Sequence, residues 1–130
     1  MFPTLFILLY GAHLLSDYAL QTDAQAEHKA LRSRAGWRAL LSHAGTHVAV
    51  SALALGAGAV LLDLPLTLPA GAAVLAWVGI SHGFIDRRWP IRWWMENTGS
   101  ADFFQKGGAP LVDQTAHVTA LLLAALVAAA

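Results

Sequence analysis

The sequence predicts an all-α membrane protein, a four-helix transmembrane bundle with short interfacial segments on the cytoplasmic side. Two observations support this class. Of the 130 residues, 57% are hydrophobic and only 12% are charged, with a mean hydropathy of +0.55, so the charge that a soluble domain spreads over its surface is missing. The apolar residues also form four runs separated by polar or turn-rich stretches. We expect residues 1–130 to be one transmembrane domain.

Each apolar run is close to the length of a membrane-spanning helix, about 20 residues for roughly 30 Å of hydrocarbon. The four predicted helices are Phe2 to Leu20, Trp37 to Leu62, Pro69 to Ile85 and Ala109 to Ala130. Small residues in "SALALGAGAV" and "PAGAAVLAWVG" favour close helix contacts. A signal peptide is the alternative for the first run, but no Lys or Arg precedes it, and His13 and Asp17 interrupt it.

The distribution of positive charge predicts the orientation. The first and third loops are basic, with Lys29, Arg32, Arg34 and Arg38 in one and Arg87, Arg88, Arg92 and Lys106 in the other. The second loop, "DLPLTLP", has no Lys or Arg. The positive-inside rule therefore places both basic loops in the cytoplasm and both termini outside. The net charge is zero and no long basic tract exists, which argues against a nucleic-acid partner, and the absence of cysteine excludes thiolate ligands.

Every predicted helix carries one pair of ionisable residues at spacing i, i+4, which puts both side chains on one helix face. The pairs are His13 and Asp17, His43 and His47, His82 and Asp86, and Asp113 and His117. With the orientation above, all four pairs lie at the cytoplasmic end. We expect two layers, with Asp17, His43, Asp86 and Asp113 near the mouth and His13, His47, His82 and His117 one turn deeper.

These eight side chains predict a metal centre. An ionisable group at membrane depth costs about 2.5 to 3.5 kcal/mol and normally marks a functional site. Two divalent cations with one hydroxide would neutralise the three carboxylates, and the donor set suits zinc first, then Fe, Mn, Co or Ni. The amides of Gln21 and Gln114 are candidates to orient the ligands. The alternatives are hydrogen-bonded His and Asp pairs that join helices, and a proton or ion relay.

Two neighbouring stretches have a predicted local role. "TDAQ" at residues 22–25 is typical of a capping box that opens a short interfacial helix through Leu31, and Pro110 fits the first turn of the fourth helix. "RRWPIRWWMENTG" interleaves arginines with tryptophans. It is either an interfacial anchor or a binding segment for an anionic lipid or phosphate head group.

The stretches "HLLSDYALQTDAQAEHK", "HAGTH", "HGFID" and "DQTAH" carry a resemblance. They resemble an uncharacterised family of small bacterial and phage integral membrane proteins with the motifs HxxxDxxLQT, HxxxD and DQxxH. The arrangement is also similar to the YdjM-like membrane-bound metal-dependent hydrolases. The resemblance implies a multi-pass protein of the bacterial inner membrane, with His13, Asp17, His82, Asp86, Asp113 and His117 in the site.

We therefore expect an enzyme, a metal-dependent hydrolase that acts on a lipid-like phosphoester, ester or amide at the cytoplasmic membrane face. Asp17, Asp86 and Asp113 are the candidates for bridging or general-base roles. The alternatives are a protein that transports or stores metal or protons, and a metal-stapled structural or partner-binding protein. The outer halves of the helices show no polar path for transport, although a homo-oligomer would be able to form one. A redox di-iron site fits less well, because such bundles use Glu-rich ligands at spacing i, i+3.

Overall fold

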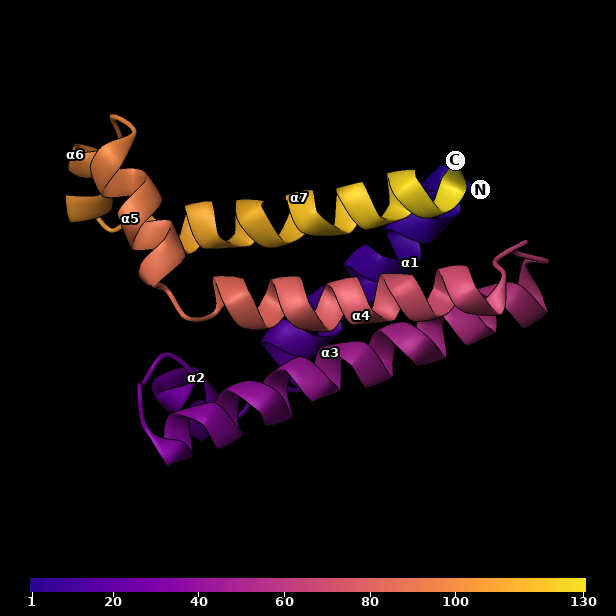
Figure 1. Cartoon of the computed structure of the whole chain (residues 1–130), viewed down its shortest axis with the longest axis horizontal. Coiled ribbons are helices and arrows are strands. Elements are labelled where there is room, and N and C mark those ends of the chain that lie inside the picture. The colour runs from indigo at the N-terminus through magenta and orange to yellow at the C-terminus, as the bar shows by residue number, and fades with distance from the viewer.

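Four long helical segments run side by side, and three shorter helices lie at one end of them, the first beside the second long segment and apart from the other two (Figure 1). The structure is a computed structural model that describes residues 1–130, and every regular element in it is a helix. In chain order the elements are α1 (Phe2–Leu14), the π-helix η1 (Leu15–Ala19), α2 (Asp23–His28), α3 (Arg34–Leu61), α4 (Leu68–Ile85), α5 (Trp89–Asn97), α6 (Ala101–Gln105) and α7 (Ala109–Ala129). The prediction of an all-α fold is confirmed.

Three helices, α3, α4 and α7, are long and apolar enough to cross a membrane. The prediction of four such helices is wrong by this measure, because α1 has only 13 residues. Its α-helical pattern stops at Leu14, and the next five residues form the π-helix η1, in which the Leu20 amide donates to the Leu15 carbonyl at 3.1 Å. The wider turn falls on the polar part of the run, where the Ser16 hydroxyl donates to the Ala12 carbonyl at 2.9 Å.

The capping box at the start of α2 is confirmed. The amide of Gln25 donates to the Thr22 hydroxyl at 3.2 Å, and the Thr22 amide donates to the side-chain oxygen of Gln25 at 2.9 Å. The helix ends at His28 rather than at Leu31. Pro110 lies in the first turn of α7, as predicted.

The second predicted helix begins three residues early. Ser33 is the N-cap of α3, and its hydroxyl accepts a hydrogen bond from the Gly36 amide at 3.1 Å. The cap allows the helix to start at Arg34, ahead of the apolar run that begins at Trp37. α3 therefore extends beyond the apolar run into the basic segment.

The four long segments form a closed ring in which α1 contacts α3, α3 contacts α4, α4 contacts α7, and α7 contacts α1. Both chain termini lie at one end of this ring, and α2, α5 and α6 lie at the other (Figure 1). The end with the termini has an apolar core made of Leu5, Leu9, Leu55, Leu64, Val74, Val78, Leu121, Ala124 and Ala125. A smaller apolar cluster, Ile85, Ile91, Met95 and Ala120, attaches α5 to α4 and α7. The interior of the opposite end is lined by histidine and aspartate instead.

Candidate metal centre

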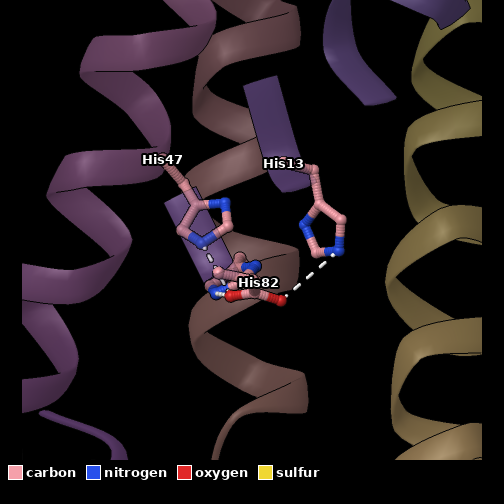
Figure 2. Close-up of side chains that lie close together, drawn as sticks. His13, His47 and His82 are labelled. Atoms are coloured by element: carbon pink, nitrogen blue, oxygen red, sulfur yellow. Dashed lines mark hydrogen bonds and ion pairs between the residues drawn. The ribbon is translucent and has the colours of Figure 1, made fainter. Parts of the chain in front are cut away.

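The structure brings all eight predicted ionisable side chains together inside the bundle, near the end that carries α2 and α5. Seven of them are at most 6% exposed, and only Asp113, at 24%, reaches the surface to a larger extent. Figure 2 shows the imidazole rings of His13, His47 and His82 converging on one region between the helices. The rings of His47 and His82 stack at a centroid distance of 3.5 Å, and those of His82 and His117 at 4.2 Å. The four helices thus place one group of donors at a single level.

Asp17 is one centre of the cluster. Its Oδ1 atom lies 3.0 Å from Nε2 of His47 and 3.1 Å from Nε2 of His43. The same oxygen lies 3.7 Å from Nε2 of His82, and Oδ2 lies 3.4 Å from Nε2 of His13. A carboxylate on η1 therefore faces histidines from three helices.

Asp86 is the second centre, and it directly follows the last residue of α4. Its Oδ2 atom lies 3.1 Å from Nε2 of His82 and 3.5 Å from Nε2 of His43. Its Oδ1 atom lies 3.6 Å from Nε2 of His117 and 2.8 Å from Nζ of Lys29. Asp86 therefore joins α3, α4 and α7 to the segment that follows α2.

Lys29 is a member of the cluster that sequence reasoning missed. The sequence places it in a basic loop, yet its side chain is only 11% exposed and forms the ion pair with Asp86. Burial alone would raise the pKa of Asp86, but the adjacent imidazoles of His117 and His82 and the charge of Lys29 hold that pKa below its ordinary range. No local pattern in the sequence indicates this pair, because the two residues lie on different elements and meet only in the folded bundle.

Three groups of side chains have ligand atoms close enough to hold a metal ion. They are His13, Asp17, His47 and His82; His43, His82 and Asp86; and Asp86, Asp113 and His117. Each group combines residues from both predicted layers. The layers describe the heights of the backbone positions, whereas the carboxylates reach along the bundle to histidines one turn away.

The two predicted orienting amides contact this cluster directly. The side-chain amide nitrogen of Gln114 donates to Oδ2 of Asp17 at 2.9 Å, while its oxygen lies 3.0 Å from Nε2 of His13. The amide nitrogen of Gln21 lies 2.9 Å from Nε2 of His43 and 3.5 Å from Oδ1 of Asp17. Both glutamines therefore hold Asp17 together with one of its histidines.

Four buried polar atoms in the cluster have no hydrogen-bond partner within the protein. They are Nδ1 of His43, Nε2 of His82, Oδ2 of Asp86 and Nε2 of His117. The last three atoms belong to two of the ligand groups, which share Asp86. Nε2 of His82 and Oδ2 of Asp86 lie 3.1 Å apart, but without hydrogen-bond geometry. Leaving such atoms unpaired costs about 1 to 3 kcal/mol each. Imidazole nitrogens and a carboxylate oxygen with free lone pairs fit a divalent cation of intermediate hardness.

A cavity of about 580 Å³ opens beside the cluster. We call it the polar cavity, and its polar lining consists of Gln21, Lys29, Asp86, Arg88, Arg92 and Asp113. Two of the three carboxylates, those of Asp86 and Asp113, line it. Asp113 faces it with a single close partner, His117, at 3.5 Å.

The fold and the site together define an all-α protein with three helices able to span a membrane and with buried His and Asp groups able to hold a metal ion. The family described as "Protein of unknown function (DUF3307)" matches residues 5–130, so the chain belongs to that family. No curated protein and no solved structure matches the chain significantly.

Proposed function

We propose that this protein is an intramembrane metalloprotein and that its buried cluster holds a divalent cation. The observation that carries the proposal is the set of unpaired donor atoms on His82, Asp86 and His117, which lie buried next to one another. Hydrogen-bonded His and Asp pairs that only joined the helices would leave no such atoms. Supporting partners of the kind that metal sites use are present for Asp17, which Gln114 contacts, and for Asp86, which Lys29 contacts.

The bundle crosses the membrane four times in this proposal. α1 and η1 have 13 and 5 residues, and these 18 residues of continuous helix are close to the roughly 20 needed to cross. The basic residues flanking α2 and α5 then lie in the cytoplasm, with both termini outside. A four-span bacterial inner-membrane protein with its polar cluster at the cytoplasmic side agrees with these features.

Lys29 changes the charge balance of the site. The three carboxylates carry three negative charges, and the ammonium of Lys29 offsets one of them. One divalent cation offsets the remaining two, so a single ion leaves the buried cluster neutral. We therefore favour one resident ion over the two that the sequence alone predicts. Zinc suits the mixed histidine and aspartate donors.

The chemistry that we propose is hydrolysis of a lipid-like substrate at the cytoplasmic face. A divalent ion in such a site lowers the pKa of bound water and polarises the scissile group. Asp17 and Asp86 are each held by several partners, whereas Asp113 has one partner and faces the polar cavity. Asp113 is therefore the residue that accepts a proton from water, and His117 orients it. The resemblance to the YdjM-like hydrolases supports the same class of reaction.

Transport is the weaker alternative because the far end of the bundle offers no polar route. Leu5, Leu9, Leu121 and their neighbours fill the interior there. An ion that reached the cluster would have to cross this apolar core, at a cost of many kcal/mol without partners.

Hydrolysis is tested with the purified protein in detergent, supplied with zinc, on a phosphoester, a carboxylic ester and an amide of a lipid. Asp113→Asn should lower turnover by about 10² to 10⁴-fold, the range for loss of a general base. Asp102→Asn is the matched control, because Asp102 is exposed on α6 and pairs only with Lys106. A wild-type protein that holds metal and hydrolyses none of the three substrates would refute the hydrolase.

A further inference from the structure

A second cavity lies next to the polar cavity, on the outer face of the bundle. This α3–α4 groove has a volume of about 950 Å³ and is mostly apolar; the lining residues used below are Trp37, Gly45, Gly79, Gly83, Arg87 and Trp89. Trp89 also lines the polar cavity, so the two spaces have one wall in common. The groove runs along two helices able to span the membrane and ends among tryptophan and arginine residues.

Glycines make the groove hollow. A Cβ atom added to Gly45 or to Gly83 would meet nothing within 4 Å, so these residues face open space rather than a close helix contact. Gly79 is different, because an added Cβ would lie 2.9 Å from Cγ2 of Val48. Two of the three glycines are thus not explained by helix packing, whereas a flexible apolar chain lying between α3 and α4 would use the space that they leave.

Positive charge gathers at the polar cavity. Arg88 has no carboxylate within 4 Å, and one of its terminal nitrogens donates only to the Ala26 carbonyl at 3.0 Å. Arg92 pairs through Nε with Glu96 at 2.9 Å. Lys29 is committed to Asp86. The unneutralised guanidinium of Arg88 and the free end of Arg92 therefore flank the same space as Asp86 and Asp113.

Arg87 brings further charge to the end of the groove. Its guanidinium stacks 4.6 Å from the ring centre of Trp37 and donates to the carbonyls of Lys29 and Leu31, each at 3.2 Å. None of these partners carries a negative charge, so the positive charge of Arg87 is also not neutralised. The apolar groove and the polar cavity thus meet at a cationic border around Trp89.

We propose that the substrate is a phospholipid whose phosphate binds in the polar cavity, between Arg88 and Arg92, and whose acyl chain lies in the α3–α4 groove. Guanidinium groups form strong, directional hydrogen bonds with phosphate. A carboxylic ester or an amide would leave the charge of Arg88 without a counterpart. That this phospholipid is a substrate rests on the proposed function, but its binding can be measured without turnover.

Hydrolysis of such a substrate at this site breaks a phosphoester. The oxygen of a water molecule forms a bond to phosphorus, and the bond between phosphorus and the leaving alcohol oxygen breaks. One proton of the water passes through Asp113 to that alcohol oxygen, so no oxidant or reductant is needed.

The test measures lipid binding in maltoside micelles, which contain no phosphate. Dioleoyl phosphatidic acid and dioleoylglycerol share both acyl chains and differ in the phosphate. Native mass spectrometry counts the lipids bound per protein, on protein as purified and after chelation. We expect phosphatidic acid to bind at least tenfold more tightly than dioleoylglycerol, as one charge-assisted contact worth a factor of about ten implies.

Two pairs of variants separate the head group from the chain. The double variant Arg88→Gln with Arg92→Gln should weaken the binding of phosphatidic acid about tenfold and leave the binding of dioleoylglycerol unchanged. Gly45→Leu and Gly83→Leu place a side chain in the open space of the groove and should weaken the binding of both lipids. Arg38→Gln and Gly56→Leu are the matched controls, since both residues are exposed and line neither cavity. Neither control should change binding of either lipid.

Equal affinity for the two lipids, or no effect of the arginine variants, would overturn the phosphate assignment. Full displacement of phosphatidic acid by millimolar inorganic phosphate, with no effect of the glycine variants, would overturn the lipid assignment. The proposed function fails separately. Protein that binds phosphatidic acid but never holds metal refutes the metalloenzyme alone, and metal-dependent hydrolysis without this binding refutes the phospholipid alone.

Discussion

The two ends of the same four helices are built by different rules. At the end with the termini, Leu5, Leu9 and Val78 fill the interior, and shape alone decides which residues fit. At the other end the interior holds histidines and aspartates, and each side chain depends on a partner of complementary chemistry. Some donor atoms there have no partner in the protein. The comparison shows that the helices are held by apolar packing at one end and meet at the other in a polar cluster able to hold a metal ion.

The largest effect should come from Asp86→Ala. Loss of the Asp86 carboxylate leaves Lys29 as a buried charge without a counterpart, which lowers the free energy of unfolding by about 3 to 5 kcal/mol. Denaturant titration of the protein in detergent measures the change. The double variant Lys29→Met with Asp86→Ala should recover a large part of it. A single variant as stable as the wild type would show that the ion pair does not form.

Metal removal should come next. A cation that binds only the folded bundle stabilises it by about 4 kcal/mol when its concentration is a thousand times the dissociation constant. Chelation should therefore lower the melting temperature, and zinc should restore it. A variant with His82→Ala should melt at the same temperature with and without chelator. An identical response of the two proteins would show that the cluster is not the binding site.

Leu9→Ala tests the packing at the end of the bundle that carries the termini. Leu9 is fully buried in the apolar core, so its truncation should cost about 3 kcal/mol through lost contacts and a cavity. Metal content should stay at the wild-type level, because Leu9 belongs to the apolar core and to none of the three ligand groups. Parallel measurements of stability and metal content check both statements. Loss of metal in this variant would mean that the two ends are coupled.

The smallest effect should come from Gln114→Leu. The amide of Gln114 holds Asp17 and His13 in position without being a ligand itself. Loss of a supporting partner of this kind typically weakens metal binding about 10- to 100-fold. Competition with a metal-sensitive dye measures the affinity. If affinity stays unchanged, the ligand group around Asp17 does not hold the ion.

The sequence predicts the location of the cluster well, for a definite reason. Spacing i, i+4 fixes which helix face a pair occupies, and the ends of the apolar runs fix its depth. Thr22 and Pro110 were equally predictable, because capping depends on residues close in the chain.

Other features depend on contacts that no local pattern encodes. The π-helix at Leu15–Ala19 shortens α1 and carries Asp17. The ion pair of Lys29 with Asp86 joins two distant segments, and it changes the expected number of metal ions. The exposure of Asp113 relative to Asp17 and Asp86 follows from how α7 sits beside the polar cavity. Sequence reasoning therefore left the three aspartates equivalent, whereas the structure distinguishes them.

The measurement that tests the central claim most directly is the metal content of the purified protein, determined by elemental mass spectrometry. We predict about one divalent ion per chain in the wild type and background levels in His82→Ala. His28→Ala is the matched control and should keep its metal, because His28 is the one histidine outside the cluster and its side chain hydrogen-bonds to the Ala24 carbonyl. A wild-type protein that holds no metal above background after exposure to zinc, iron, manganese, cobalt and nickel would contradict the account.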